Sequence, residues 1–423
     1  MIAEIVAAGS EMLGPYRQDT NSLWLTERLN ELGVSVAFKT IVGDNLEHLI
    51  GAAKIAVGRV DVVIFSGGLG PTEDDKTREA VAAALGLGLR RDNDLLTGIY
   101  KRFAARRMAM PQNNAKQADV LEGAEVLANA QGSAPGQFLD TVVGRHRKIV
   151  ILLPGPPKEL KAMYEDTVWG RLEGALPVRH MAKRMLRMAL IPESEVDART
   201  APIYGQYEDV ETTILAGSGE IQLHFVCVKR TEEEAQARVD ELAEKIEAEM
   251  GEAVFSSDGE TLEEVVLLML GLRHMTLAAA ESCTGGLLAQ RLTAVPGSSR
   301  YFLGGAVVYA DRLKTEFADV EEELIEREGP VSEAVARALA EGIRRRTGAT
   351  VGVGITGIAG PGLGTGADEG KPVGLVYVGL SFEDDGGVGK VMELNLSGDR
   401  ERIRFWATQH ALEMLRRSLL ERV

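Results

Sequence analysis

A seven-residue stretch in the last third of the sequence carries the side chains best suited to nucleophilic chemistry. Ala280-Glu281-Ser282-Cys283-Thr284-Gly285-Gly286 follows an apolar run and precedes a helical pattern. Backbone N–H groups at a helix start lack partners within the helix, so they can bind an anion or a developing oxyanion. The stretch predicts an acyl-transfer site or, more simply, a tight turn in which Ser282 caps a helix.

Two further stretches place polar groups directly after apolar runs. Tyr309 and Lys314 follow one run, and the glycine-rich residues 356–370 follow another. Ligands in open α/β sheets bind beyond the carboxyl ends of the strands. We therefore expect the three loops to converge on one site, with residues 357–366 suited to a polar ligand or phosphate.

The bases that the sequence offers limit the choice of nucleophile. None of the six histidines lies in these loops, which argues against a Ser–His–Asp triad. Cys283 is intrinsically more nucleophilic, but no nearby histidine could form a thiolate pair with it. Ser282 with Lys314 as base remains. Because the amine of a solvent-exposed lysine has a pKa of about 10.4, a basic Lys314 must be buried or lie beside a cation such as Arg400.

A second glycine-rich stretch lies near residue 70, again between an apolar run and a helical pattern. It reads Ser66-Gly67-Gly68-Leu69-Gly70-Pro71-Thr72-Glu73-Asp74-Asp75-Lys76-Thr77. Its glycines allow backbone amides to wrap a phosphate, although it is neither a Walker loop nor a dinucleotide fingerprint. Asp74 and Asp75 could hold Mg²⁺ together with substrate phosphates, or could only complement the dipole of the next helix.

The elements that must position these loops fall into three sections. In residues 1–168, runs rich in Val and Ile alternate with helical patterns, which predicts a mostly parallel sheet covered on both faces. Residues 169–255 show a β–α–β–β–α pattern, typical of a small α+β connector. Residues 256–423 alternate again, with strands expected at 275–280, 306–309, 351–356 and 375–380 and helices starting at Thr261 and Ser332.

The composition narrows the function classes. The 423 residues are 45% hydrophobic and 26% charged, as in ordinary globular proteins. A net charge of −16 opposes nonspecific nucleic-acid binding, and two cysteines give no disulfide framework. The first residues do not resemble a signal peptide, and the apolar runs are too short to span a bilayer. We expect a cytoplasmic protein that binds neither nucleic acid nor membrane.

The motifs of the last third resemble those of the nicotinamide mononucleotide deamidase family, the C-terminal domain of CinA (competence/damage-inducible) proteins. The resemblance implies hydrolysis of nicotinamide mononucleotide to nicotinic acid mononucleotide and ammonia, without metal or cofactor. It makes Ser282 the nucleophile and Lys314 its base, assisted by Tyr309 and Arg400. The matching motifs are Ala280–Gly286, Tyr309–Lys314, Gly357–Pro361, Lys371–Gly374 and Ser397–Arg400. The residues expected to contact substrate are Glu281, Cys283, Thr284, Gly285, Gly286, Thr356, Gly357, Gly360 and Arg404, the last also a second candidate for the arginine role.

The first section resembles the N-terminal domain of CinA proteins, related in fold to the three-layer α/β molybdopterin-binding proteins of the MogA and MoaB type. The motifs that carry the likeness are residues 9–13, 43–45, 66–77, 132–136 and 153–157. The resemblance implies hydrolysis of ADP-ribose to AMP and ribose 5-phosphate with a divalent metal such as Mg²⁺. The metal ligands would be Asp44, Asp74 and Asp75, and the residues around the phosphates Gly67, Gly68, Gly70 and Thr72.

The connector resembles the KH-like middle domain of CinA proteins. A KH domain clamps RNA with a Gly-x-x-Gly loop, whereas the turn here reads Gly217-Ser218-Gly219-Glu220. We therefore expect a spacer or dimer element and, from the family, a homodimer. Two other hypotheses stay open: a molybdopterin-binding protein, and an interaction protein of competence or DNA repair with vestigial sites.

Overall fold

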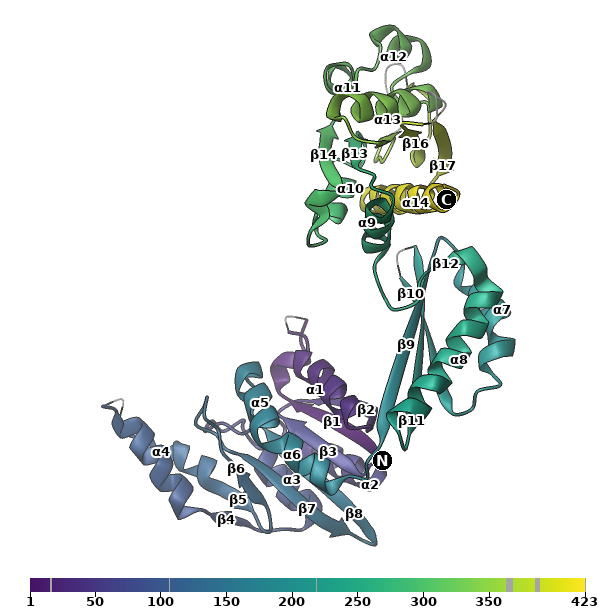
Figure 1. The fold of residues 1–423 in the computed structure, drawn as a ribbon. Coiled ribbons are helices and arrows are strands. Elements are labelled where there is room, and N and C mark those ends of the chain that lie inside the picture. Colours follow the sequence, from purple (N-terminus) through teal and green to yellow (C-terminus); the bar gives the residue numbers. More distant parts are fainter. Residues whose placement is uncertain (16, 106, 218, 363–367, 385–388, 423) are drawn as a thin grey trace. The chain divides into compact units, whose positions relative to one another are not determined.

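The computed structural model forms two compact units. One comprises residues 1–182 with 228–236, and the other residues 183–227 with 237–423. The domain boundaries predicted at 168/169 and 255/256 stay a prediction. The structure, drawn in Figure 1, describes residues 1–15, 17–105, 107–217, 219–362, 368–384 and 389–422.

A six-stranded sheet in the order β2-β1-β3-β8-β7-β6 forms the centre of the first unit. The first four strands run parallel, and β7 pairs antiparallel with both β8 and β6. The predicted mostly parallel sheet is therefore confirmed. The strands are β1 (Ile2–Ala8), β2 (Ser35–Val42), β3 (Val62–Ser66), β6 (Glu125–Leu127), β7 (Gly136–Val143) and β8 (His146–Leu153).

Helices cover both faces of this sheet because successive side chains of a strand point to opposite sides. Ile5 and Ile64 pack in one hydrophobic cluster with α1, α5 and α6, whereas Val6 and Phe65 pack in another with α2 and α3. This confirms the three-layer arrangement. The remaining elements are α1 (Thr20–Glu31), α2 (Leu46–Arg59), α3 (Thr77–Leu85), β4 (Leu89–Arg91), α4 (Asn93–Ala105), β5 (Asp119–Leu121), α5 (Pro157–Met163) and α6 (Trp169–Ala175), with short helical segments η1 (Ser10–Met12), η2 (Gln112–Ala118) and η3 (Tyr164–Val168).

The connector is a four-stranded sheet, in the order β10-β11-β9-β12, with two helices. Helix α8 buries one apolar stripe and exposes a charged face. The residues of the stripe are Ala235, Val239, Leu242, Ile246 and Met250. The elements are β9 (His180–Ala189), α7 (Glu193–Tyr204), β10 (Val210–Gly217), β11 (Glu220–Lys229), α8 (Glu232–Met250), η4 (Gly251–Ala253) and β12 (Val254–Ser256).

The C-terminal sheet has the order β14-β13-β15-β16-β17, and it too has helices on both faces. Leu277 and Ala279 of β13 join the cluster of α9, α10 and α14, while Ala278 and Ala280 join that of α11, α12 and α13. The elements are α9 (Leu262–Leu272), β13 (Leu277–Glu281), α10 (Leu287–Thr293), η5 (Ser298–Arg300), β14 (Phe302–Val307), α11 (Asp311–Ala318), α12 (Glu322–Glu328), α13 (Glu333–Thr347), β15 (Val351–Gly357), β16 (Leu375–Phe382), β17 (Lys390–Asn395) and α14 (Arg400–Leu420).

Helix starts follow the sequence closely, but one strand does not. Thr261 forms a capping box with Glu264, and Ser332 accepts a hydrogen bond from the Val335 amide, which confirms both predicted starts. The strand expected at 306–309 instead spans Phe302–Val307. The start of this strand was missed because it contains glycines, which are uncommon in strands. A Cβ at Gly305 would lie 2.0 Å from the Ala279 carbonyl oxygen, so only glycine fits this close approach to β13.

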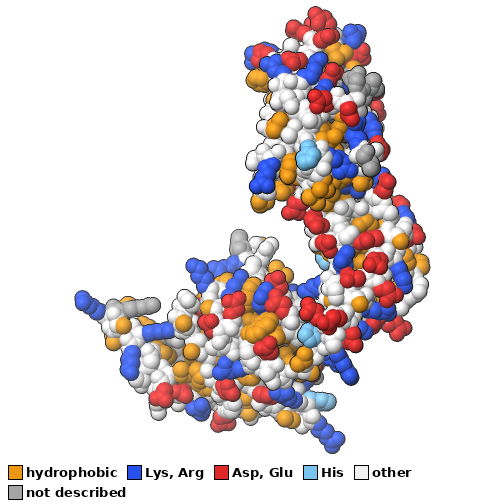
Figure 2. Space-filling model, viewed as in Figure 1, with side chains coloured by type: hydrophobic (Ala, Val, Ile, Leu, Met, Phe, Trp, Pro, Cys, Tyr) orange, Lys and Arg blue, Asp and Glu red, His pale blue; other side chains and the backbone are white. Residues whose placement is uncertain are grey.

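The surface and the helices give two more observations on partners. On the face seen in Figure 2, acidic and basic side chains are interspersed, with no single large basic patch. Among the described residues, none of the helices combines the length and the apolar character needed to cross a membrane.

Candidate functional site

The carboxyl ends of three adjacent strands meet at Ser282. Glu281, the last residue of β13, is in register with Val307 of β14 and with Ile355 of β15, both parallel to it. The Ser282 amide continues this pattern by donating to the Ile355 carbonyl (2.9 Å). The loops after β13, β14 and β15 therefore leave the same edge of the sheet, which confirms the expected convergence.

Ser282 and Cys283 lie in different environments. The Cys283 side chain packs in the hydrophobic cluster with Leu288 and Leu292, and burial raises the pKa of its thiol to about 12. The thiol is therefore protonated at neutral pH. Cys283 was expected to contact substrate. Because its side chain is part of the core, only its backbone could make that contact. Ser282, 7% exposed, is the nucleophile candidate of the pair.

Glu281 caps helix α10, and this corrects two expectations. Its buried carboxylate accepts hydrogen bonds from the amides of Gly286 (3.1 Å), Leu288 (3.0 Å) and Ala289 (2.8 Å). Glu281 was expected to contact substrate, and the helix-start amides were expected to be open to an oxyanion. The carboxylate fills the anion site of the helix start itself, since that position favours negative charge.

Arg404 of α14 holds the turn that follows Ser282. Its Nε and Nη2 donate to the Thr284 carbonyl at 3.1 and 2.7 Å. The Thr284 hydroxyl is buried and has no hydrogen-bond partner among the described residues. Gly285 and Gly286 both have positive φ (60° and 90°), which explains the glycine pair. Arg404 thus positions the turn.

Lys314 is buried, as a lysine base requires, but its neighbour differs from the expected cation. Only 2% of the residue is exposed, and its Nζ donates to Asp311 Oδ1 at 2.8 Å. Arg400, suggested as the neighbouring cation, donates instead to the Gly360 carbonyl (2.6 Å) and to the Tyr309 hydroxyl (2.9 Å). Arg400 therefore joins the loops after β14 and β15 to the start of α14.

The end of β15 departs from expectation at Thr356. The Thr356 hydroxyl, expected to contact substrate, donates to the Pro330 carbonyl at 2.7 Å, and the residue is fully buried. A Cβ at Gly357 would lie 2.8 Å from the Leu375 carbonyl oxygen, so this glycine serves the packing of the strands. Gly360 remains at the site through Arg400. The predicted phosphate segment 357–366 lies outside the described residues from 363 onward.

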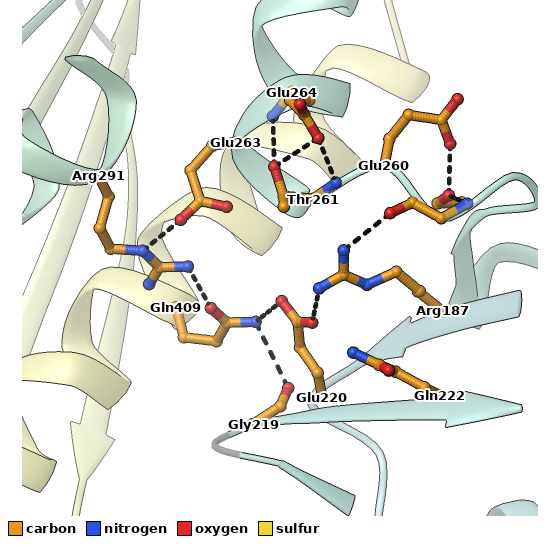
Figure 3. A network of polar contacts seen from close by, with 12 residues as sticks. Arg187, Gly219, Glu220, Gln222, Glu260, Thr261, Glu263, Glu264, Arg291 and Gln409 are labelled. Carbon is orange, nitrogen blue, oxygen red and sulfur yellow. Dashed lines mark hydrogen bonds and ion pairs between the residues drawn. The ribbon is translucent and has the colours of Figure 1, made fainter. Parts of the chain in front are cut away.

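A polar network anchors α14, the helix that carries both arginines (Figure 3). Arg291 of α10 donates to Glu263 (2.5 Å) and to Gln409 Oε1 (2.6 Å). Gln409 in turn donates through Nε2 to Glu220 (3.2 Å), which also pairs with Arg187. Gly219 and Glu220, which lead into β11 of the connector, therefore contact α14 of the C-terminal domain.

The glycine loop of the first unit lines a cavity of about 1130 Å³. The carboxyl ends of β1, β3 and β8 border it. A Cβ at Gly67 would lie 2.4 Å from the Ala8 carbonyl oxygen, and one at Gly68 would lie 2.1 Å from the Thr77 hydroxyl, so the glycines are packing requirements too. Of the predicted residues, the cavity brings together Gly67, Gly68, Gly70, Asp44, Asp74 and Asp75, but not Thr72.

The three carboxylates of this cavity already have local partners. Asp44 accepts from the Ser10 amide (2.8 Å), and Asp75 from the Thr72 amide (2.9 Å). A hydrogen bond from Thr72 and the charges of Lys116 and Lys76 lower the pKa of Asp74. Among the described residues, no three His, Cys, Asp or Glu side chains group closely enough to hold a metal. A metal here would need substrate phosphates as further ligands, which Mg²⁺ favours.

Three residues at this cavity carry no signal in the sequence. The buried Arg78 guanidinium holds the loop by donating to the carbonyls of Leu69 (2.8 Å) and Gly70 (3.2 Å). Asn21 and Gln117 line the cavity from elements far from the loop in sequence. An arginine near a helix start is normally expected to be exposed, and a single Asn or Gln belongs to no sequence motif. No local pattern therefore marks these positions.

Comparison with known families divides the chain into three matched segments. Residues 4–174 match a probable molybdopterin binding domain, residues 183–256 the damage-inducible protein CinA KH domain, and residues 259–419 the CinA C-terminal domain. These matches, in this order, confirm the predicted succession of fold types.

Relatives match along the whole chain. A CinA-like protein of Acidobacterium capsulatum is 57% identical over 99% of this chain and 100% of its own length. One from Koribacter versatilis is 56% identical with the same coverage. Among solved structures, a CinA protein of Thermoplasma acidophilum is 33% identical, covers 40% of this chain and 95% of its own, and gives a TM-score of 0.36.

Proposed function

Because the chain belongs to the CinA family, we propose that its C-terminal domain hydrolyses the carboxamide of nicotinamide mononucleotide, with Ser282 as nucleophile. The observation that carries the proposal is the meeting of three loops at one sheet edge. There Ser282 follows β13, the buried Lys314 lies in the helix after β14, and Arg400 ties Tyr309 to Gly360.

The reaction follows acyl-transfer chemistry. The Ser282 hydroxyl attacks the amide carbonyl while its proton passes to the neutral amine of Lys314. The C–N bond then breaks, the lysine returns the proton to the departing ammonia, and an ester remains on Ser282. Water hydrolyses that ester to the carboxylate of nicotinic acid mononucleotide and restores the hydroxyl. For the lysine to accept a proton, its ion pair with Asp311 must be loosened when substrate binds.

The oxyanion of this reaction needs donors other than the capped helix amides. The candidates are the amides of Cys283 and Thr284, which follow the nucleophile, and the guanidinium of Arg400. Donors fixed in place before reaction stabilise developing charge best. Arg404, by fixing the Thr284 carbonyl, would hold the two amides in position.

Ammonia release tests the proposal. Purified full-length protein should release equal amounts of ammonia and nicotinic acid mononucleotide from nicotinamide mononucleotide, with or without EDTA. The Ser282→Ala variant serves as the blank for contaminating amidases. A native protein no faster than this variant would reject the deamidase assignment and favour an interaction protein.

For the first unit we propose metal-dependent hydrolysis of ADP-ribose to AMP and ribose 5-phosphate. Asp74 and Asp75, beside a glycine loop in a cavity of nucleotide size, support it. A divalent metal, held by these carboxylates and the substrate's phosphates, would neutralise charge on the diphosphate. The chain's own loop amides would orient the phosphates, and Arg78 would keep the loop in shape.

AMP formation with Mg²⁺ and with EDTA tests this second activity. Asp74→Asn and Asp75→Asn should each reduce it, and the double variant should abolish it. Asparagine is preferred to alanine because Asp75 accepts from Thr72, and an amide oxygen keeps that contact. Activity unchanged by EDTA would remove the metal assignment. No activity with any metal, together with fluorescence of a bound pterin, would favour the molybdopterin hypothesis.

A further inference from the structure

Gln117 carries an unused hydrogen-bond acceptor at the wall of the cavity of the first unit. The residue is 1% exposed, yet it lines the cavity, and its Oε1 has no partner among the described residues. A buried carbonyl oxygen without a partner costs stability, so native proteins seldom retain one without a reason. Its position at the wall of a cavity suggests that the missing partner is a ligand.

Asn21 presents a second acceptor of the same kind. Its Nδ2 donates to the Gly155 carbonyl (2.8 Å) and to Ser66 Oγ (3.1 Å). Because a carbonyl oxygen can only accept, this contact fixes the amide orientation and identifies the unpartnered buried atom as Oδ1. Asn21 lines the same cavity. Two acceptors on different elements are therefore left for donors that the described residues do not supply.

The glycine loop supplies hydrogen-bond donors to the same cavity, in contrast to the two acceptor oxygens. Gly68 and Gly70 line it with backbone suited to an anion, whereas the Gly67 amide already donates to the Leu153 carbonyl (3.0 Å). Anions accept but do not donate hydrogen bonds. A bare phosphate would leave both amide carbonyls unpaired. A ligand that carries hydroxyl or amino groups as well as phosphate would satisfy both kinds of group.

We propose that Gln117, together with Asn21, selects a phosphorylated sugar or nucleotide over bare phosphate by accepting hydrogen bonds from its hydroxyl or amino groups. This inference rests on the proposal that the cavity binds a phosphorylated ligand, but not on hydrolysis. Gln117 is thus a specificity residue. Its Oε1 has no hydrogen-bond partner in the free protein and gains one when the ligand binds.

Calorimetric titration of the full-length protein with Mg²⁺ and ribose 5-phosphate, AMP or pyrophosphate tests the proposal. Gln117→Met removes the acceptor and approximately keeps side-chain volume. We expect it to weaken ribose 5-phosphate and AMP about tenfold, the value of one well-placed hydrogen bond, and to leave pyrophosphate within about twofold. Loss for AMP alone would assign the donor to the adenine amine, and loss for both to the ribose. Both results support the selection.

Thermal unfolding without ligand separates selection from a structural role. Gln117→Met should raise Tm by a few degrees, because it removes a buried unpaired group. Gln137 is the matched control: it is fully buried and satisfied, accepting from the Leu121 amide (2.9 Å) and donating to the Asp119 carbonyl (2.9 Å). Gln137→Met should lower Tm and leave all three affinities within about twofold.

The outcomes separate this inference from the function on which it rests. Gln117→Met that binds every probe like the native protein, or that loses Tm as Gln137→Met does, overturns the inference alone. A native protein that binds none of the three probes overturns the proposed phosphate site and the inference with it.

Discussion

Ser282 and Cys283 show how one peptide unit separates a reactive group from a structural one. Past the end of β13 the chain turns, so the serine stays at the sheet edge while the thiol enters the core. A thiol is intrinsically the stronger nucleophile, but the position of Cys283 in the core makes it the less reactive of the two. Burial raises the pKa of the Cys283 thiol from 9.0 to about 12, and a thiol that does not ionise does not attack.

We predict that Ser282→Ala lowers kcat for deamidation about 10³-fold or more, while Cys283→Ala retains most activity and loses about 1 kcal/mol of stability. Because an acid with a raised pKa stays protonated below that value, Cys283 should resist iodoacetamide at pH 8 in the folded protein and react after unfolding. Both rates and labelling by mass spectrometry are measured on the same samples. An inactive Cys283→Ala beside an active Ser282→Ala would make the thiol the nucleophile.

Lys314 and Asp311 pose a test of the base. We predict that Lys314→Met lowers kcat about 10²–10⁴-fold, the usual range for loss of a general base. Asp311→Asn keeps an oxygen that can accept from Lys314 Nζ, so kcat should fall far less than in Lys314→Met. The side chain of Asp311 is more than half exposed, which keeps the stability cost of Asp311→Asn small. A Lys314→Met variant with kcat close to that of the native protein would contradict Lys314 as base.

At the scale of elements, the cap of α10 sets the position of the nucleophile. Glu281 ends a strand and holds the first turn of the next helix, so the five residues between them form a closed turn around Ser282. Arg404 fixes the same turn from α14. Contacts from β13 and from α14, which are distant in sequence, thus hold the same loop in one conformation, as a preorganised site requires.

We predict that Glu281→Ala destabilises the protein by about 1–3 kcal/mol, because three amides at the start of α10 lose their acceptor, and lowers kcat by displacing Ser282. Glu281→Gln keeps one neutral acceptor oxygen and should be milder in both respects. Urea unfolding and ammonia release measure the two effects. Full activity with equal destabilisation in both variants would mean that the cap supports the fold but not the nucleophile.

At the scale of the whole molecule, the connector contributes contacts to α14. Gln409 donates to Glu220, and Arg416 donates to the Glu252 carbonyl (2.6 Å). These contacts lie on the part of α14 that follows Arg400 and Arg404. They secure the helix but touch none of the proposed reacting groups.

We predict that residues 256–423 expressed alone fold and keep deamidation, with a lower Tm than the same domain in the full chain. All five motifs of the proposed deamidase site lie in this fragment, whereas Glu220 and Glu252, the connector partners of Gln409 and Arg416, do not. Full-length Glu220→Ala is the matched comparison and should keep kcat/KM within about twofold. A folded fragment without activity would show that the site takes residues from the connector or from a second copy of the chain.

The sequence by itself determined the succession of folds and the sheet edge at which the three loops meet. Apolar runs placed β13, β15 and β16 within two residues, and capping residues located the starts of α9 and α13. These signals are local, since periodicity, caps and turns depend on neighbours within a few residues. Parallel strands also share one carboxyl edge, so the meeting of the three loops followed from topology alone.

Only the tertiary structure decided which polar side chains face the site. Glu281 and Thr356 stand in site motifs yet bond to backbone groups, and Cys283 enters the core. Gln117 and Asn21, which stand in no recognised pattern, line a cavity with unpaired oxygens. The reason is that a polar side chain's role depends on which groups from distant segments lie within about 3 Å of it, and hydrogen bonds of that length are set by packing rather than by neighbouring residues.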